Sequence, residues 1–222
     1  MRYFAVSEGR ESKAKMIEAV LCDFLGVQNI EGKKILDLGC GSGRIAGNFS
    51  HANEVIAADV VDQLTTPEKS SFQFTLIDSA FLPFEDNSFD IVIYNHVFYC
   101  AIDKPGQLKE IHRVLSGNGI CYFASVNRYF PIEGFTNIPL IHYLPDSLFR
   151  SIYKIIRKTD DDLFPAGYHK IIRLIEHAGF RYREYTSDII QDAAKYHSEH
   201  SVPFYFPLPR WLSPTVVLIL IK

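Results

Sequence analysis

The fold of this chain is decided by one stretch, Ile35-Leu36-Asp37-Leu38-Gly39-Cys40-Gly41-Ser42-Gly43-Arg44. A strand-like apolar run leads into three alternating glycines, and a helical segment follows. Glycine accepts a positive φ and lets the backbone approach a ligand closely. A helix that begins at such a turn directs its free N–H groups toward whatever lies there. The stretch therefore predicts a cradle for a nucleotide-type cofactor at the carboxyl end of a buried strand.

The spacing of the glycines distinguishes the cofactor class. A dinucleotide fingerprint, G-x-G-x-x-G, needs its third glycine three residues after the second. Here Gly43 comes one residue early, Arg44 stands where that fingerprint needs a small residue, and Asp37 is not part of it. No G-x-x-x-x-G-K-[ST] occurs, so a P-loop is excluded. The segment resembles the first motif of the class I S-adenosylmethionine (SAM)-dependent methyltransferases, D-L-G-C-G-[ST]-G.

Two further strands end in acids at places that match this family. Glu54-Val55-Ile56-Ala57-Ala58-Asp59 is an apolar run that ends 16 residues after Gly43. An acid at this position can accept two hydrogen bonds from a ribose diol. The run 74–78 ends in Asp78, and the resemblance assigns to this acid the amino group of adenine.

Two later segments extend the resemblance. Residues 82–92 resemble the family's loop into the fourth strand, and residues 110–119 resemble its helix-to-fifth-strand turn, usually E-x-x-R-V-L-x-P-G-G. Gly117 and Asn118 replace the usual Pro-Gly there, in a turn away from the cofactor. The likeness is close over residues 30–126 and looser over the last strands. It is nearest to the methyltransferase type 11 branch, which includes the ubiquinone- and menaquinone-type enzymes.

The resemblance implies SAM as cofactor and S-adenosyl-L-homocysteine as product. It assigns the following residues to the cofactor site: Asp37, Leu38, Gly39, Cys40, Gly41, Gly43, Asp59, Val60, Asp78, Ser79, Ala80, Asn95 and His96. Asp37 is expected to help fix the amino-acid end of the cofactor; the alternative is an acid that caps the next turn. A backbone carbonyl at Asn95 is expected to bind the SAM ammonium group.

The reacting centre is less specified. His96 follows the fourth strand, where cofactor and substrate sites meet, and an imidazole titrates near neutral pH, so His96 is the candidate general base. The alternative is a histidine packed under the sulfonium with no proton role. The candidates for the substrate pocket are Tyr99, His142, Tyr143 and His169. Each of them could equally serve packing.

Length and composition limit the function classes. The chain has 222 residues, 47% of them apolar, which suits a single α/β domain over residues 1–222. A formal net charge of −3 argues against DNA or RNA as a partner. The four cysteines lack metal spacing, and His197, Glu199 and His200 give only a hint of it, so no metal is expected. No secretory signal follows Met1, which predicts a cytoplasmic protein. We expect this protein to be a monomer or a homodimer.

Apolar runs and turn residues predict alternating strands and helices. The resemblance implies a Rossmann-like, doubly wound, seven-stranded sheet, mostly parallel with an antiparallel last strand. Strands are predicted at 33–38, 54–58, 72–76, 89–94, 119–125, 180–186 and 213–221, and helices at about 10–25, 43–50, 105–115 and 167–178. The longest apolar run, residues 216–221, is far shorter than the roughly 20 residues of a membrane span.

Residues 127–165 break this alternation and predict a cap. The segment is too apolar for disorder and too long for an ordinary loop, so we expect a lid over the methyl-transfer site. Within it, a helix at 146–157 should pack the stripe Leu148/Ile152/Ile156 inward. The alternative is that this basic, apolar helix contacts a membrane surface and presents a lipid substrate. Its moderate length and the run Asp160-Asp161-Asp162 favour the lid.

These features predict a SAM-dependent methyltransferase for a small molecule. The aromatic cap suggests an apolar, aromatic or lipid-linked acceptor, since ligand pockets are mostly apolar. The rival is an interaction protein that binds SAM and has lost the chemistry, because fold does not fix function. The intact Asp37, Asp59 and Asp78 argue against lost binding. The sequence leaves open whether carbon, oxygen or nitrogen receives the methyl group.

Overall fold

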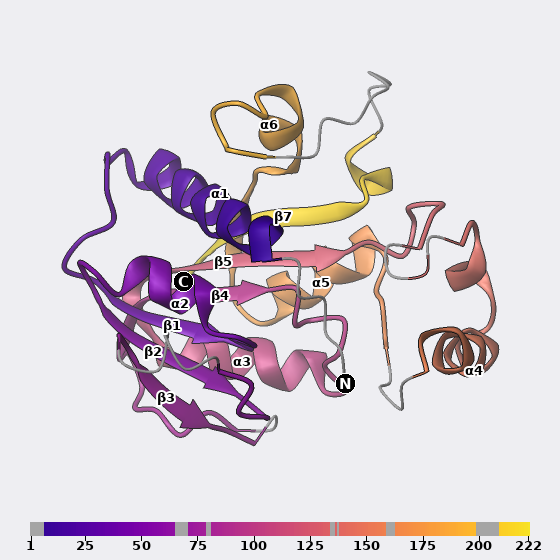
Figure 1. The fold of residues 1–222 in the computed structure, drawn as a ribbon, viewed down its shortest axis with the longest axis horizontal. Coiled ribbons are helices and arrows are strands. Elements are labelled where there is room, and N and C mark those ends of the chain that lie inside the picture. The colour runs from indigo at the N-terminus through magenta and orange to yellow at the C-terminus, as the bar shows by residue number, and fades with distance from the viewer. Residues whose placement is uncertain are drawn as a thin grey trace.

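The computed structural model describes residues 7–64, 71–78, 81–133, 136, 138–158, 163–198 and 209–222, with side chains from residue 12 onward. Within these residues a seven-stranded sheet forms the centre, in the order β3-β2-β1-β4-β5-β7-β6 (Figure 1). The strands are β1 (Lys34–Leu38), β2 (Glu54–Asp59), β3 (Gln73–Leu76), β4 (Phe89–Asn95), β5 (Leu115–Val126), β6 (Arg181–Glu184) and β7 (Thr215–Ile221).

The strand order creates a crevice at one edge of the sheet. β1 pairs in parallel with β2 and β4, β3 pairs in parallel with β2, and β5 pairs in parallel with β4. β7 runs antiparallel between β5 and β6, which confirms the predicted mostly parallel sheet with an antiparallel last strand. The chain builds outward from β1 to β3 and then crosses back to β4. Ligands of open α/β sheets bind at such a reversal, outside the carboxyl ends of the strands.

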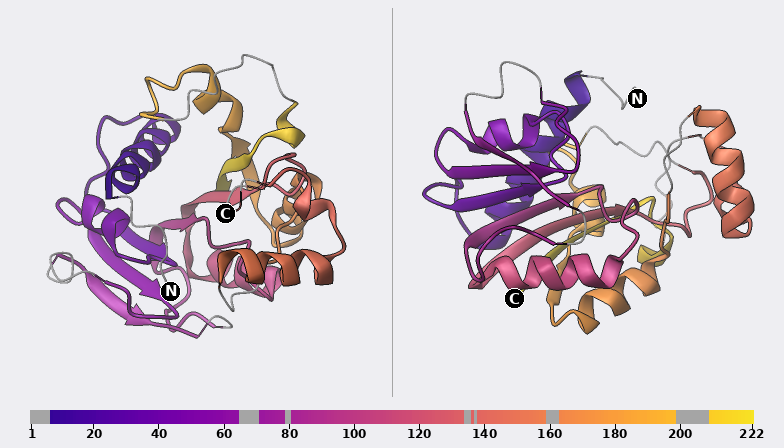
Figure 2. Two further views of the ribbon diagram at one scale, coloured as in Figure 1. Left: turned by 45° about the vertical axis from the view of Figure 1, so that its right-hand side comes forward. Right: turned by 90° about the horizontal axis from the view of Figure 1, so that it is seen from below.

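Helices cover both faces of the sheet (Figure 2). The helices α1 (Ser7–Leu25), α2 (Arg44–Phe49) and α6 (Thr186–Gln191) share one apolar core. The helices α3 (Lys104–Val114) and α5 (Tyr168–His177) share the other. Successive residues of a strand point to opposite faces, so Ile35 of β1 joins the first core and Leu36 joins the second. This double burial explains the continuous apolar runs of the parallel strands.

Three features differ from the sequence-based expectation. β5 begins at Leu115 rather than at residue 119, because Leu115 pairs with Phe89 before a register shift. α6 lies where no helix was predicted. The Oγ1 atom of Thr186, at its start, accepts the backbone N–H of Val217 in β7 at 2.9 Å. β6 covers only four of the seven residues expected at 180–186.

The segment after β5 projects beyond the carboxyl ends of the strands (Figures 1 and 2). It contains η2 (Ile141–Tyr143) and α4 (Asp146–Arg157), which has the predicted bounds. A third apolar cluster joins this segment to the loop after β4; it consists of Tyr99, Ile141, Phe149, Tyr153 and Leu163. The predicted facing of α4 is wrong in part, because Phe149 and Tyr153 are buried whereas Leu148 and Ile156 are exposed.

Arg128 fastens this segment to the end of β5. Its guanidinium donates to the carbonyl oxygens of His142 at 2.8 Å and Leu144 at 3.0 Å. It also pairs with the carboxylate of Asp146, at the start of α4, at 2.5 Å. A planar guanidinium can hold several acceptors in fixed directions, so a single side chain sets the path from η2 into α4.

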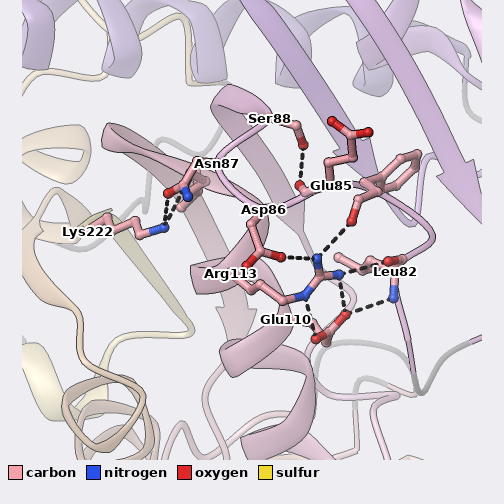
Figure 3. Close-up of polar contacts among 10 residues, drawn as sticks. Leu82, Glu85, Asp86, Asn87, Ser88, Glu110, Arg113 and Lys222 are labelled. Atoms are coloured by element: carbon pink, nitrogen blue, oxygen red, sulfur yellow. Dashed lines mark hydrogen bonds and ion pairs between the residues drawn. The ribbon is translucent and has the colours of Figure 1, made fainter.

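Arg113, in the last turn of α3, fastens the connection between β3 and β4 in the same way (Figure 3). It donates to the carbonyl oxygens of Leu82 at 2.9 Å and Phe84 at 2.8 Å, and to the Asp86 carboxylate at 2.7 Å. Glu110 accepts two further bonds from Arg113 and one from the Leu82 N–H. The Glu and Arg of the E-x-x-R pattern, Glu110 and Arg113, therefore hold the connection between β3 and β4 in place.

Candidate functional site

The three glycines of the turn after β1 all have positive φ, at 76° for Gly39, 55° for Gly41 and 81° for Gly43. L-residues with a side chain rarely adopt such values. A Cβ atom on Gly39 would lie 2.3 Å from Cγ2 of Val97, in the loop after β4. A Cβ atom on Gly41 would have no neighbour within 4 Å. Gly39 therefore lets two chain segments touch, while the Gly41 backbone faces open space that a ligand can approach.

Gly43 serves the packing behind the turn. A Cβ atom there would lie 2.6 Å from side-chain atoms of both Leu64 and Phe72. α2 begins at the next residue, Arg44, and its first turn is held by Asp37. Gly39 and Gly43 thus have different neighbours that leave no room for a side chain, whereas at Gly41 only the positive φ disfavours one.

Asp37 is buried, with 2% of its surface exposed, and one carboxylate oxygen accepts the Ala46 N–H at 3.1 Å. Burial raises the pKa of Asp37 to about 7; the Ala46 hydrogen bond opposes this rise, and the negative charge of Asp59 adds to it. The alternative noted for Asp37, support of the following turn, therefore occurs in the structure. A contact with the cofactor's amino-acid end stays a prediction.

Asp59 joins the ends of β1 and β2. Its Oδ2 atom accepts the Gly41 N–H at 2.8 Å, and its Oδ1 atom accepts the Val60 N–H at 2.7 Å. The Oδ1 atom also accepts the Val61 N–H at 3.3 Å. An ionised carboxylate has about four acceptor positions, so about one remains for a hydroxyl donor. Val60 is half exposed directly beside this carboxylate. The arrangement is chemically suited to a ribose with an adjoining flat, apolar base.

The end of β3 lies next to the end of β2. The Ile77 N–H donates to the Asp59 carbonyl oxygen at 3.0 Å, and Asp78 forms an isolated bridge with Phe81. Asp78 therefore belongs to the same edge of the sheet as Asp59, as the sequence predicted. Ser79 and Ala80 lie outside the described residues.

The end of β4 completes this edge. Asn95 is the last residue of β4, and His96 follows with a positive φ of 56° and an N–H bond to the Ala124 carbonyl oxygen at 2.8 Å. A histidine held in this region is strained, and such residues cluster at functional sites. Val97 then contacts the glycine turn at Gly39. The structure thus brings the first motif and the predicted Asn95–His96 pair together.

The substrate candidates are distributed over the projecting segment and its neighbours. Tyr99 is buried in the third apolar cluster, and its carbonyl oxygen accepts the Phe164 N–H at 2.7 Å. Tyr143 is half exposed and donates to the Tyr129 carbonyl oxygen. The ring of His169 lies 6.0 Å from that of Tyr129.

His142 has a structural role inside the segment. Its side chain is buried, and Nε2 lies 2.5 Å from the Phe130 carbonyl oxygen. Burial lowers the pKa of His142. Its carbonyl oxygen is also held by Arg128. Because the His142 side chain is buried and its Nε2 is already engaged, contact with a substrate is a weaker expectation for His142 than for the half-exposed Tyr143.

Lys104 was not singled out from the sequence. It is buried at the start of α3, where Nζ donates to the Ala101 carbonyl oxygen at 2.6 Å. Its ammonium lies 5.3 Å from the ring centre of Phe98 and 5.5 Å from that of Phe164. Burial lowers the pKa of Lys104 to about 8. No local pattern distinguishes this lysine from a solvated one, because both rings come from elsewhere in the sequence.

The described residues contain no group of three or more histidine, cysteine or acidic side chains that could hold a metal. His197 lies within these residues, whereas Glu199 and His200 lie outside them. The expectation of a protein without a metal therefore remains a prediction. The chemistry of the edge rests on backbone N–H groups, carboxylates and apolar side chains.

Comparisons with known proteins agree with a cofactor site at this edge of the sheet. Residues 36–123 match the family described as Methyltransferase domain. The chain is similar to the "Arginine-hydroxylase NDUFAF5, mitochondrial" of Danio rerio, 33% identical over 96 residues, which are 41% of this chain and 30% of that protein. It is also similar to the "Ubiquinone/menaquinone biosynthesis C-methyltransferase UbiE" of Shewanella oneidensis, 31% identical over 101 residues, covering 40% of each.

A solved structure extends the likeness to the whole chain. A SAM-dependent methyltransferase from Aquifex aeolicus aligns over 99% of both chains with a TM-score of 0.58 and 15% identity. At this identity the likeness shows the fold alone. The chain spans less than half of the length of the two curated relatives, so their activities are not transferred to it as facts.

Proposed function

We propose that this chain, whose residues 36–123 belong to the class I SAM-dependent methyltransferases of the type 11 branch, transfers the methyl group of SAM to a small molecule. One observation carries the proposal. The glycine turn after β1 bonds through Gly41 to Asp59 and packs through Gly39 against Val97, so the ends of β1, β2 and β4 form one continuous edge.

The residues at this edge fit SAM, the cofactor that the family implies. A Cβ atom on Gly41 would have no neighbour within 4 Å, so a ligand can approach this backbone, and Asp59 keeps acceptor capacity for a ribose hydroxyl. Asp78 is proposed to accept from the adenine amino group, and the carbonyl group of Asn95 to accept from the ammonium group. SAM supplies an activated methyl group on its sulfonium; the protein supplies placement.

The chain's own contribution is orientation and exclusion of water. We propose that residues 127–165 act as the lid. This is supported by the apolar cluster that Phe149 and Tyr153 share with Tyr99, in the loop after β4. His96 is proposed to take a proton where the acceptor atom carries one. The aromatic side chains of the lid favour an apolar, aromatic or lipid-linked acceptor.

The test is a search for the methylated product. The protein is incubated with SAM labelled on its methyl group and a small-molecule extract, and the labelled compound is identified. We expect one extractable molecule to gain the label while S-adenosylhomocysteine accumulates in equal amount. The Asp59→Ala variant serves as the control and should give less product at low SAM concentration, since it removes the proposed ribose contact.

The second candidate is a SAM-binding protein with another role. It is favoured by one finding: a relative with a matching domain is named for arginine hydroxylation rather than for methyl transfer. This candidate predicts that S-adenosylhomocysteine binds but that no labelled product forms with any extract, including a protein extract. Absence of binding would remove both candidates.

A further inference from the structure

The cap helix α4 contacts the rest of the chain through Phe164. Like the other helices in the described ranges, α4 is not long and apolar enough to cross a membrane. The guanidinium of Arg150, on α4, lies 5.0 Å from the centre of the Phe164 ring, and the ammonium of Lys104, at the start of α3, lies 5.5 Å from it. The Phe164 N–H donates to the carbonyl oxygen of Tyr99, in the loop after β4, at 2.7 Å. Phe164 is therefore a joint between α4, α3 and this loop.

Lys104 brings into this joint a buried charge that its surroundings compensate only in part. Only 7% of its surface is exposed, and Nζ donates to the Ala101 carbonyl oxygen, whereas an ammonium has three N–H donors. No carboxylate of the described residues pairs with it. The rings of Phe98 and Phe164 attract the charge. Contacts of this kind offset only part of the cost of removing an ammonium from water.

The charged and titratable groups near Lys104 do not reverse this balance. Burial lowers the pKa of Lys104 from 10.5 to about 8; the positive charge of Lys170, on α5, adds to this, and Cys100, in the loop after β4, opposes it. α4 contributes another cation, Arg150, beside the Phe164 ring. The acid that precedes Lys104, Asp103, accepts a backbone N–H within the first turn of α3 at 2.9 Å. The joint therefore favours the neutral form of Lys104.

We propose that the joint of Lys104 and Phe164 makes the position of the cap depend on pH, with the cap held more firmly when Lys104 is neutral. When Phe164 separates from α3, Lys104 regains water and its ordinary preference for the charged form. Closing the joint therefore releases a proton, so a rising pH favours closure. The cost of the buried charge is fully present below pH 8 and is lost as the pH rises from about 8 toward 10.5.

The loop after β4 links this joint to the glycine turn. Residues 99 and 101 of the loop provide the carbonyl oxygens that accept from Phe164 and Lys104. Val97, in the same loop, lies against Gly39. The cap and the proposed cofactor site thus share one connecting loop. The proposal concerns only the position of the cap, so it holds whether or not the chain transfers methyl groups.

The test is hydrogen–deuterium exchange at the Phe164 N–H, whose acceptor lies across the joint. The full chain is pulse-labelled without cofactor at about pH 7 and about pH 9, and each rate is compared with that of an unprotected amide at the same pH. We expect the protection of this N–H to rise several-fold with pH. The upper limit is about tenfold, which follows from pKa values of about 8 in the closed joint and 10.5 in the open one.

Lys104→Met separates this proposal from a purely structural role. The variant removes the buried charge, so its Phe164 N–H should be better protected than in the wild type near pH 7, and the protection should not change with pH. A lysine that only held the Phe164 ring by its charge would give the opposite result, a loss of protection. The matched control is Lys109→Met, at an exposed position of α3, which should keep the wild-type protection and its pH dependence.

Two results would overturn the proposal. One is protection of the wild type that does not change with pH; the other is a Lys104→Met variant that is less protected than the wild type or keeps its pH dependence. Thermal melting establishes that each variant is folded. If Lys104→Met does not fold, Lys104→Arg gives the second comparison, because a guanidinium stays charged over this range. Its protection should not rise with pH, and a rise like that of the wild type would also overturn the proposal.

Discussion

At the scale of single residues, Asp59 links the proposed cofactor site to the fold. Its carboxylate holds the Gly41 N–H and the Val60 N–H, so the same group shapes the turn and faces the expected ribose. We predict that Asp59→Ala weakens S-adenosylhomocysteine binding by roughly 1.5–3 kcal/mol, as expected for hydrogen bonds to a charged group. Titration calorimetry measures the loss. NAD should not bind the wild type.

The control for this measurement is Glu54→Ala. It removes an acid from the other end of β2, where Glu54 forms only an exposed ion pair with Lys34. Glu54→Ala should bind S-adenosylhomocysteine like the wild type. If Asp59→Ala does so as well, the assignment of the ribose contact to β2 is wrong.

Asp37 makes stability depend on pH. Its folded pKa of about 7 lies above the ordinary value of 3.8, so the folded state retains a proton that the unfolded state loses. This contribution is fully present below pH 3.8 and is lost as the pH rises toward 7. We predict that Asp37→Asn, which keeps an acceptor for Ala46, gains stability relative to the wild type over this window.

The size of this gain has an upper limit. A shift of roughly three pH units corresponds to about 4 kcal/mol at 1.36 kcal/mol per unit. Urea unfolding at several pH values between 4 and 7 measures the difference between the two proteins. Parallel pH profiles for wild type and variant would show that Asp37 is ionised throughout and would contradict the prediction.

At the scale of elements, two arginines use the same pattern to fix a connection. Arg113 binds the carbonyl groups of residues 82 and 84 and the acid at 86; Arg128 binds those of residues 142 and 144 and the acid at 146. The Arg128 connection follows the carboxyl end of β5, on the side of the proposed site, whereas the Arg113 connection leads into the start of β4 at the opposite edge of the sheet. A side chain with a planar fork of donors is needed for this, and lysine does not provide it.

We therefore predict that Arg113→Lys costs roughly 2–4 kcal/mol of unfolding free energy, because several charge-assisted hydrogen bonds to carbonyl groups and acids are lost together. Urea unfolding measures the loss. Arg173→Lys, on the exposed side of α5, is the matched control and should change stability by less than about 0.5 kcal/mol. A loss below 1 kcal/mol for Arg113→Lys would mean that water replaces these bonds without cost.

Contacts of this kind explain which parts of the fold can be predicted from the sequence. The sheet was predictable because the glycine turn and the apolar strands are local signals. The start of β5 and the existence of α6 were not, since they depend on pairing of Leu115 with Phe89 and of Thr186 with Val217. α4 carries apolar side chains over a broad arc, and packing in the cluster with Tyr99, Ile141 and Leu163 selects the aromatic half for burial.

The site follows the same rule. Asp37 and Gly41 are recognisable because they belong to one short motif, and Asp59 is recognisable because it ends the next apolar strand. The contact of Val97 with Gly39 and the aromatic surroundings of Lys104 join distant segments and leave no pattern in the sequence. Local motifs therefore predict what binds the cofactor, whereas the parts that position the cap emerge only with the tertiary structure.

At the scale of the whole molecule, the cap is joined to the sheet at a narrow base. Asn127 and Ala166 form a parallel bridge, and the Arg128 N–H donates to the Ala166 carbonyl oxygen at 3.1 Å. The two ends of the projecting segment are therefore adjacent. Asn127 also donates to the carbonyl oxygens of Trp211 and Ser213, so it belongs to the sheet side and should be retained in any shortened chain.

We predict that replacing residues 128–165 by a short Gly-Ser linker separates cofactor binding from turnover. The edge that carries Gly41 and Asp59 lies outside the removed segment, so S-adenosylhomocysteine affinity should stay within about tenfold, or 1.4 kcal/mol. Methyl transfer should be lost, because the segment proposed to exclude water and cover the acceptor is gone. Calorimetry and the labelled-methyl assay measure the two quantities.

A second, milder variant tests the same prediction if the shortened chain does not fold. Phe149→Ala/Tyr153→Ala leaves the chain length unchanged but removes the side chains that attach α4 to Tyr99. It should reduce methyl transfer strongly while S-adenosylhomocysteine binds as in the wild type. If either variant transfers methyl groups at the wild-type rate, the segment is no lid, and acceptor binding must be sought on the sheet side of the edge instead. Loss of cofactor affinity by more than about 100-fold would instead make the segment part of the cofactor site.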